Sequence, residues 1–249
     1  MNQGKDVKIY IDGRKYTAQV GRPLLEVALK AGIDIPHLCY HPALSPYGAC
    51  RLCLVREVET GRILASCTLP VRDGLSVISE DEELFYLRRT LLELLAAMAP
   101  KAKGLSELYE RYQVNPTRFF RREPQNACIL CGRCVRVCNE VLERGVLEFA
   151  FRSIQTKVAT AFLEPSSECA GCLACESLCP TGAISVLYTE EKLTIEGLYG
   201  TSHRILRCKE CGKPLTTEGQ IKELGLDAGL CSSCRRKQEA NRWARFHRL

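Results

Sequence analysis

The sequence predicts an α+β protein built from several small parts rather than from one large domain. Three features favour this fold class: short apolar runs near the N-terminus, one long amphipathic stretch, and sixteen cysteines that all fall into groups of four. With 249 residues, of which 46% are hydrophobic, the chain can bury sizeable cores. The predicted parts are residues 1–80, a helical linker at 81–123, residues 124–195, and residues 200–249.

Residues 1–80 are predicted to form a β-grasp domain. Apolar runs at 7–11 and 15–20 flank Asp12-Gly13, which is a strong signal for a tight hairpin turn. Pro23 opens a helical stretch, and Gly32 is placed to end it. The remaining strands are expected at 52–58, 62–66 and 75–78. A hairpin, a helix and then a cysteine loop is the order of elements in a β-grasp ferredoxin.

The linker is predicted to be mainly helical. Residues 81–98 begin with an acidic run and carry apolar side chains at helical spacing, which is typical of an amphipathic helix. Pro100 ends this helix, and a second short helix is expected near 105–112.

The first cysteine group has the spacing C-x10-C-x2-C-x13-C. Its members are Cys39, Cys50, Cys53 and Cys67. The close central pair and the distant last cysteine are typical of plant-type 2Fe-2S ferredoxins, although the first gap is longer here. Gly48 would let backbone N–H groups approach the sulfur atoms closely. We therefore predict a 2Fe-2S cluster, and we expect the neighbouring His37 and His41 to pack or hydrogen-bond rather than ligate.

Two further groups have the spacing C-x2-C-x2-C-x3-C of bacterial ferredoxins, which hold 4Fe-4S clusters. They are Cys128, Cys131, Cys134 and Cys138, and Cys169, Cys172, Cys175 and Cys179. A zinc site is disfavoured, because zinc ligands come in pairs with a long gap between them. These two groups predict a bacterial-type two-cluster 4Fe-4S ferredoxin domain in residues 124–195.

In two-cluster ferredoxins the fourth cysteine of each run ligates the other cluster. Cys179 is therefore expected to join Cys128, Cys131 and Cys134, and Cys138 to join Cys169, Cys172 and Cys175. Pro180 follows the second run, but Asn139 stands at the same place after the first, which puts the local turn at Cys138 in doubt. Arg133 and Arg136 would favour the reduced state of a nearby cluster, unless they are simply solvated.

The C-terminal group has the spacing C-x2-C-x19-C-x2-C of a zinc ribbon. Its members are Cys208, Cys211, Cys231 and Cys234. Gly212 suits the turn after the first pair. A single iron ion or a further 4Fe-4S cluster would use the same four ligands, so the metal remains open between zinc, one iron and a cluster.

Composition excludes two other classes of protein. A disulfide scaffold is typical of short secreted chains, and the first residues here lack the regions of a signal peptide. The apolar stretch at 91–99 is far shorter than the roughly 20 residues of a membrane-spanning helix. We therefore expect a cytoplasmic protein without a membrane span. The net charge of +6 is concentrated at 118–122 and in the C-terminal tail, which we interpret as docking surfaces rather than a nucleic-acid grip.

Residues 5–190 resemble a known family of iron-sulfur proteins. The motifs that carry the resemblance are CILCGRCVRVCNEV, FAFRSIQTKVATAF and CAGCLACESLCPTGAI, together with the N-terminal cysteine loop. The chain is similar to the iron-sulfur region of the large subunit of respiratory complex I, to the diaphorase small subunit of NAD-linked hydrogenases, and to the N-terminal region of [FeFe]-hydrogenase. The C-terminal module resembles a four-cysteine appendage of some hydrogenase-linked ferredoxin subunits.

One motif of that family is missing. Its members usually carry an extra cluster on His-x3-Cys-x2-Cys-x5-Cys, whereas residues 68–127 contain neither a cysteine nor a histidine. The resemblance then implies that electrons pass from the 2Fe-2S domain to the tandem without a middle relay.

The resemblance implies a non-catalytic electron-relay subunit of a cytoplasmic oxidoreductase complex. The expected partners in this hetero-oligomer are a flavin-containing NAD(P)H dehydrogenase subunit and a catalytic redox subunit or a ferredoxin. The sequence has no GxGxxG after a strand, no P-loop, and no cysteine after Cys234 for a hydrogen-activating cluster. A freestanding polyferredoxin and a nucleic-acid-binding regulatory protein are the alternatives.

Overall fold

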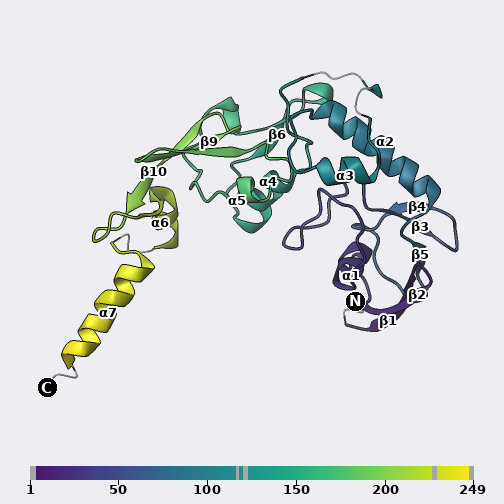
Figure 1. Ribbon diagram of the computed structural model, residues 1–249, viewed down its shortest axis with the longest axis horizontal. Helices are drawn as coiled ribbons and strands as arrows, with labels where there is room; N and C mark the ends of the chain where they lie inside the picture. Colours follow the sequence, from purple (N-terminus) through teal and green to yellow (C-terminus); the bar gives the residue numbers. More distant parts are fainter. Residues whose placement is uncertain (1–3, 116–117, 120–122, 226–228, 247–249) are drawn as a thin grey trace. The chain divides into compact units, whose positions relative to one another are not determined.

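The computed structural model describes residues 4–115, 118–119, 123–225 and 229–246 (Figure 1). The chain divides into two compact units. The first comprises Met1–Glu143 with Leu178–Ala183, and the second comprises Arg144–Ser177 with Ile184–Leu249. The segment that contains Cys179 therefore returns to the first unit.

A five-stranded sheet forms the N-terminal part of the first unit. Its strands are β1 (Asp6–Ile11), β2 (Arg14–Gln19), β3 (Leu54–Glu57), β4 (Ile63–Ala65) and β5 (Ser76–Ile78), in the order β2-β1-β5-β3-β4. Asp12 and Gly13 both have positive φ, as the predicted tight turn between β1 and β2 requires. β5 runs parallel to β1, and the other neighbours are antiparallel.

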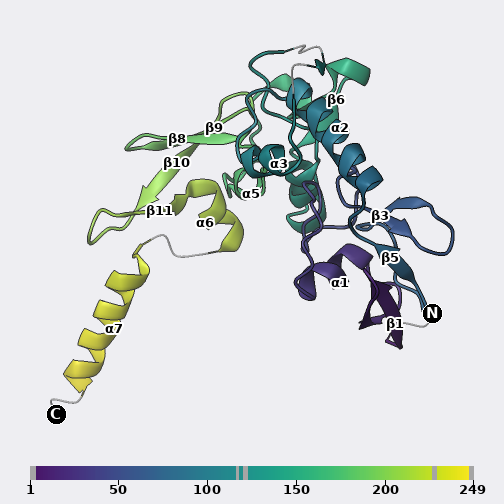
Figure 2. The same cartoon turned by 45° about the vertical axis from the view of Figure 1, so that its right-hand side comes forward.

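Helix α1 (Leu24–Lys30) buries its apolar side chains against this sheet (Figure 2). Leu24, Leu25 and Ala28 are fully buried in one core with Ile9 and Ile11. All predicted elements of this region are found within one or two residues of their expected bounds, because alternation and turn residues are local signals.

Helices α2 (Glu82–Met98) and α3 (Ser106–Arg111) follow, where the linker was predicted to be helical. Asp81 caps α2, because its carboxylate accepts a hydrogen bond from the Leu84 N–H at 2.8 Å. The buried face differs from the apolar stripe of the sequence, since Arg88 and Glu93 are 1% exposed whereas Leu87 is 36% exposed. A salt bridge from Arg89 accompanies the buried Glu93.

Helix α2 packs against a second core that joins distant parts of the first unit. Its buried members are Leu38, Cys39, Cys50, Leu52, Leu92, Ala99, Leu105, Tyr112, Ile129 and Cys131. Two cysteines of the first group and one of the second thus share one hydrophobic cluster. The first unit also holds α4 (Arg133–Arg136) and a π-helical turn at Val137–Val141.

The second unit contains two antiparallel sheets. The larger has the order β11-β10-β9-β8 and is formed by β8 (Ser185–Tyr188), β9 (Lys192–Glu196), β10 (Thr201–Arg207) and β11 (Pro214–Thr217). The smaller pairs β6 (Glu148–Ala150) with β7 (Lys157–Ala159). The helical elements are the 3-10 turns Ser153–Gln155 and Ala161–Leu163, α5 (Ala174–Ser177), α6 (Glu218–Leu224) and α7 (Ser232–Phe246).

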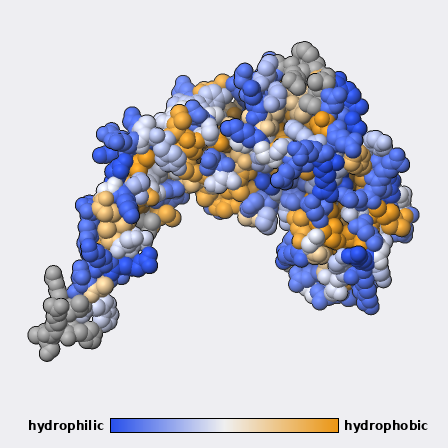
Figure 3. Space-filling model, in the orientation of Figure 1, coloured by the Kyte–Doolittle hydropathy of each residue, from blue (hydrophilic) through white to orange (hydrophobic). Residues whose placement is uncertain are grey.

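The larger sheet crosses the interval between the third and fourth predicted parts, because Thr201 on β10 pairs with Ile195 on β9. The four-part division itself stays a prediction. The mixed α+β class is confirmed. Hydrophilic side chains predominate on the face shown in Figure 3, with smaller hydrophobic patches between them. Within the described ranges, no helix is long and apolar enough to cross a membrane.

The cap of α2 gives a testable stability prediction. Asp81 also accepts a hydrogen bond from Arg56 Nε at 2.7 Å, so it connects the start of the helix to β3. Asp81→Ala is expected to lower the free energy of unfolding by about 0.5–2 kcal/mol, measured by anaerobic denaturant unfolding. Glu82→Ala, which removes an exposed acid of the same turn, is the matched control. Equal effects of the two variants would contradict this assignment.

Candidate metal centres

The first cysteine group gathers in a buried pocket of the first unit. Cys39, Cys50, Cys53 and Cys67 are at most 7% exposed. The Sγ atom of Cys39 lies within hydrogen-bonding range of the sulfur atoms of Cys50 and Cys67, and that of Cys53 lies within range of Cys67. Backbone N–H groups also point at sulfur: that of Leu38 donates to Cys50 at 3.4 Å, and that of Cys50 donates to Cys39 at 3.5 Å.

The pKa shifts of the four thiols indicate that this pocket suits a cation. Hydrogen bonds from the thiols of Cys50 and Cys67 lower the pKa of Cys39 to about 2, and the hydrogen bond with Cys67 lowers the pKa of Cys53 to about 6. Hydrogen bonding to these neighbours, together with burial, raises the pKa values of Cys50 and Cys67. The thiols therefore compete for ionisation, and positively charged iron would allow all four to become thiolates.

The loop around Cys50 is shaped by two residues with left-handed backbone. Gly48 has φ 74°, and a Cβ atom there would lie 3.3 Å from Cγ2 of Thr68. Arg51 has φ 57°, which the sequence did not signal. The two nearby histidines serve local contacts: His37 Nδ1 lies 2.8 Å from the Ile35 carbonyl, and His41 Nδ1 accepts from the Ala43 N–H at 3.2 Å.

The first ferredoxin-type run belongs to the first unit, as does Cys179. Burial raises the pKa of Cys128, and it raises that of Cys131 to about 11. The charge of Cys179 adds to both shifts, so Cys179 lies close to Cys128 and Cys131 although it is distant in the sequence. Hydrogen bonds reach these sulfur atoms from the N–H groups of Leu130 at 3.4 Å and Ala183 at 3.2 Å.

Both ferredoxin-type runs have left-handed backbone at the same two positions. In the first run Leu130 and Gly132 have positive φ, and at the equivalent places of the second run Gly171 and Leu173 do. Left-handed residues placed among right-handed ones turn successive N–H groups toward one concave side, which favours an anionic group such as an iron-sulfur cluster. Leucine in this conformation is strained, and such strain is typical of functional sites.

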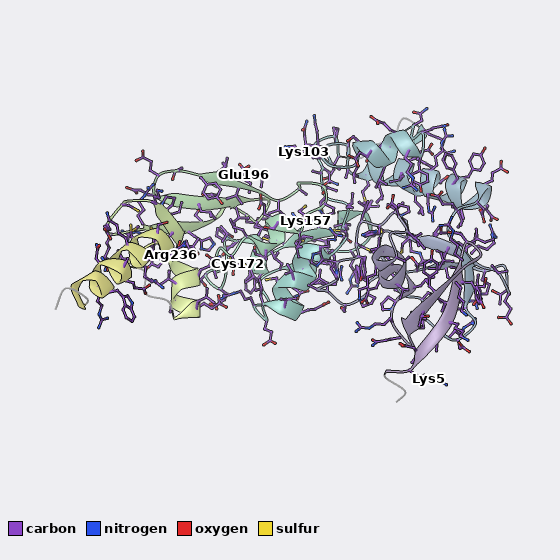
Figure 4. All side chains as sticks on the ribbon, turned by 60° about the horizontal axis from the view of Figure 1, so that its bottom comes forward. Lys5, Lys103, Lys157, Cys172, Glu196 and Arg236 are labelled. Carbon is purple, nitrogen blue, oxygen red and sulfur yellow. The ribbon has the colours of Figure 1, made fainter. Side chains whose placement is uncertain are left out.

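The two runs differ in backbone structure at the fourth cysteine. Cys138 lies inside the π-helical turn Val137–Val141, whereas Pro180 directly follows Cys179 in the second run. Asn139 thus allows the helix to continue where proline would end it. Cys138 belongs to the first unit, and Cys169, Cys172 and Cys175 belong to the second (Cys172 is labelled in Figure 4). Their common ligation of one cluster stays a prediction.

The C-terminal cysteines gather tightly in the second unit. The sulfur atoms of Cys208, Cys211, Cys231 and Cys234 all lie within 4.8 Å of one another. The Sγ atoms of Cys211 and Cys231 are 3.7 Å apart. Four ligands at about 2.3 Å from one tetrahedral ion would be separated by about 3.8 Å, so the spacing fits a single ion.

Backbone N–H groups prepare this site for a metal. The N–H of Cys231 donates to Cys208 Sγ at 3.3 Å, and it is the main cause that lowers the pKa of Cys208 to about 6. The N–H of Cys234 donates to Cys231 Sγ at 3.4 Å and lowers the pKa of Cys231. Thiolates are the form that binds metal, so these hydrogen bonds favour binding.

The module that carries this site packs onto the second ferredoxin-type run. The Thr217 hydroxyl donates to the Ala170 carbonyl at 2.5 Å, and a Cβ atom on Gly219 would lie 2.9 Å from Ala170 Cα. His203 approaches Gly171 so closely that a Cβ there would lie 2.6 Å from His203 Cδ2. Sequence reasoning missed this packing, and the glycine inside α6 is the signal that could have indicated it.

Comparison with known proteins adds two family matches. Residues 4–82 match the family described as 2Fe-2S iron-sulfur cluster binding domain, and residues 127–183 match the family described as 4Fe-4S dicluster domain. These matches confirm the predicted presence of both kinds of domain.

Individual relatives cover most of the chain. It is 30% identical to the NADH-ubiquinone oxidoreductase 78 kDa subunit of Candida albicans, over 72% of this chain and 28% of the relative. It is 35% identical to a NADP-reducing hydrogenase subunit of Solidesulfovibrio fructosivorans, over 71% of this chain and 35% of the relative. The chain thus spans about a third or less of these curated relatives.

A solved structure is similar to about three quarters of the chain. This is a chain in the crystal structure of NAD+-reducing [NiFe]-hydrogenase in the H2-reduced state, with a TM-score of 0.63 and 31% identity. The match covers 77% of the present chain and 88% of that chain.

The contact between α6 and the second run gives a prediction with a definite sign. Replacing a helical glycine by alanine normally stabilises a helix by about 0.5–1 kcal/mol. In Gly219→Ala the new methyl group would instead meet the Ala170 backbone, so we expect faster amide hydrogen exchange in residues 218–224. Mass spectrometry of the anaerobic protein measures this exchange, with the exposed Glu218→Ala as control. Slower exchange in Gly219→Ala would contradict the close packing.

Proposed function

Because the chain belongs to the family of iron-sulfur subunits that respiratory NADH dehydrogenases share with NAD-linked hydrogenases, we propose that it relays single electrons within a multi-subunit oxidoreductase. The observation that carries this proposal is the core that contains Cys39, Cys50 and Cys131 together. This core brings the first cysteine group next to the first ferredoxin-type run. Electron transfer between two metal sites would require such proximity.

The proposed ligands follow the four cysteine groups, with Cys138 and Cys179 exchanged between the two ferredoxin-type runs. Cys39, Cys50, Cys53 and Cys67 would hold a 2Fe-2S cluster in a β-grasp domain, and Cys128, Cys131, Cys134 and Cys179 would hold a 4Fe-4S cluster. Cys138, Cys169, Cys172 and Cys175 would hold the second 4Fe-4S cluster. The C-terminal cysteines would form a ribbon around one zinc or iron ion, because their sulfur atoms lie too close together for a cubane, in which each cysteine binds a different iron.

Iron-sulfur clusters supply the ability to accept and release one electron at a time. The residues of this chain bury the cysteines in hydrophobic cores and donate N–H groups to their sulfur atoms. Burial and hydrogen bonding to sulfur are two of the means by which proteins set the potentials of such clusters. The chain itself would therefore determine where and at what potential an electron rests.

Hydride chemistry is assigned to a partner. A hydride carries two electrons, so a flavin-containing NAD(P)H dehydrogenase subunit would divide them before they reach this chain. A catalytic redox subunit or a ferredoxin would exchange electrons with the other end of the relay. The relatives support an assembly with other subunits, since they are named as subunits of NADH- or NADP-linked oxidoreductases. A cytoplasmic location stays a prediction.

Metal content tests the ligand assignment. The anaerobically purified chain should contain about ten irons with one zinc, or about eleven irons without zinc, according to the metal of the ribbon. Cys231→Ala should remove only the ribbon metal, whereas Cys39→Ala should remove about two irons and the paramagnetic signal of the reduced 2Fe-2S centre. About fourteen irons would contradict the single-ion site.

Reduction by nucleotide tests the division of labour. The isolated chain should be reduced by dithionite but not by NADH or NADPH, and it should become reducible by one of these when the co-purified flavoprotein is added. Optical bleaching and electron paramagnetic resonance follow the reduction. Oxidation of NADH by the isolated chain with an artificial acceptor would show that the chain is more than a relay.

A further inference from the structure

Three arginines of the first unit lie around the first cysteine group, and among the described residues none of them forms a salt bridge with a carboxylate. Arg88 is 1% exposed and Arg136 is 7% exposed, while Arg133 is half-buried. The Nε atoms of Arg133 and Arg136 are buried without a hydrogen-bond partner. Arg88 comes from α2, and the other two come from α4 within the first ferredoxin-type run.

Each guanidinium binds backbone carbonyls of the segments that carry Cys39 and Cys53. Arg88 donates to the Leu52 carbonyl at 3.2 Å and to the Leu54 carbonyl at 2.5 Å, on either side of Cys53. Arg136 donates to the Cys39 carbonyl at 2.6 Å. Arg133 donates to the neighbouring Tyr40 carbonyl. These bonds position all three cations at the wall of the same sulfur pocket.

Arg133 stands near cysteines of both groups. It lies between Cys131 and Cys134 in the ferredoxin-type run, and its guanidinium donates to the carbonyl of Tyr40, the residue after Cys39 in the N-terminal loop. Arg133 thus connects the first ferredoxin-type run to the loop that carries Cys39.

These cations need a negative counterpart. In the part of the chain that the structure describes, Arg88, Arg133 and Arg136 form no salt bridge with a carboxylate, and their hydrogen bonds go to neutral carbonyl and hydroxyl oxygens. The carboxylate of Glu140, four residues after Arg136, accepts hydrogen bonds from the Ser45 N–H at 2.9 Å and from the Ser45 hydroxyl at 2.7 Å. Buried charge without compensation is strongly unfavourable. A cluster held by four thiolates is anionic, and reduction makes it more so.

We propose that Arg133 is a positioning residue shared by the 2Fe-2S site and the first 4Fe-4S site, and that its charge stabilises the reduced state of both. The inference rests on the proposed relay function and deepens it. Arg88 acts on the 2Fe-2S site alone, because its carbonyl acceptors flank Cys53. A cation between the two sites also weakens the repulsion between two reduced clusters, so both can hold an electron at once.

The test is an anaerobic redox titration of the full chain, in which electron paramagnetic resonance follows each centre separately. Removing the charge in Arg133→Gln should lower both midpoint potentials. The expected change is about threefold to tenfold in the reduced-to-oxidised ratio at a fixed potential, where tenfold corresponds to about 59 mV for one electron. Arg133→Lys keeps the charge and should retain both potentials within about twofold of that ratio.

Arg14→Gln is the matched control. Arg14 is exposed at the start of β2, a strand that carries no cysteine, so its charge is screened by solvent and its removal should change the ratios much less. The proposal is overturned if Arg133→Gln moves only one potential, if it does no more than Arg14→Gln, or if Arg133→Lys behaves like Arg133→Gln. If Arg133→Gln loses iron and Arg133→Lys does not, the charge at this position is required, which supports the proposal. If Arg133→Lys loses iron as well, the proposal is overturned.

Failure of the proposed role of Arg133 can be distinguished from failure of the proposed relay function. If the unmodified chain shows neither centre, the proposed function fails. If it shows both centres with measurable potentials and these do not respond to Arg133→Gln, only the role of Arg133 fails.

Discussion

Mutual repulsion between thiolates is the constraint on which the rest of this structure depends. Sulfur atoms that lie within 4.8 Å of one another at the C-terminal site, and within hydrogen-bonding range at the N-terminal site, cannot all be charged without help. Two features of the chain reduce this repulsion. At the partly exposed C-terminal site, backbone N–H groups donate to sulfur. At the buried N-terminal site, arginine side chains are added.

Helix α2 contributes to this arrangement through packing and through hydrogen bonds. Its apolar side chains close the core that contains Cys39, Cys50 and Cys131, and its Arg88 donates to four groups, namely three carbonyls and the Tyr112 hydroxyl. The helix lies in the stretch 68–127, which contains neither a cysteine nor a histidine. This stretch contributes packing, and the two flanking cysteine groups meet in one core.

Local signals account for the parts of the fold that sequence reasoning predicted well. Asp12-Gly13 sets the first hairpin, the α2 helix follows its acidic start, and the cysteine spacings indicated the groups that gather. Features that depend on tertiary contacts were not predictable in the same way. The burial of Arg88 in place of Leu87 requires knowledge of the carbonyls that face α2. The pairing of Thr201 with Ile195, and the approach of Gly219 to Ala170, join segments whose proximity no spacing rule encodes.

The two ferredoxin-type runs place their single internal glycine differently. Each run uses two left-handed residues between its first three cysteines, but glycine takes the second of these places in one run, as Gly132, and the first in the other, as Gly171. Leucine supplies the remaining place in both. The requirement is therefore for a backbone shape and not for glycine at a fixed position. A search pattern that demands glycine at either position would find one of these runs and overlook its twin.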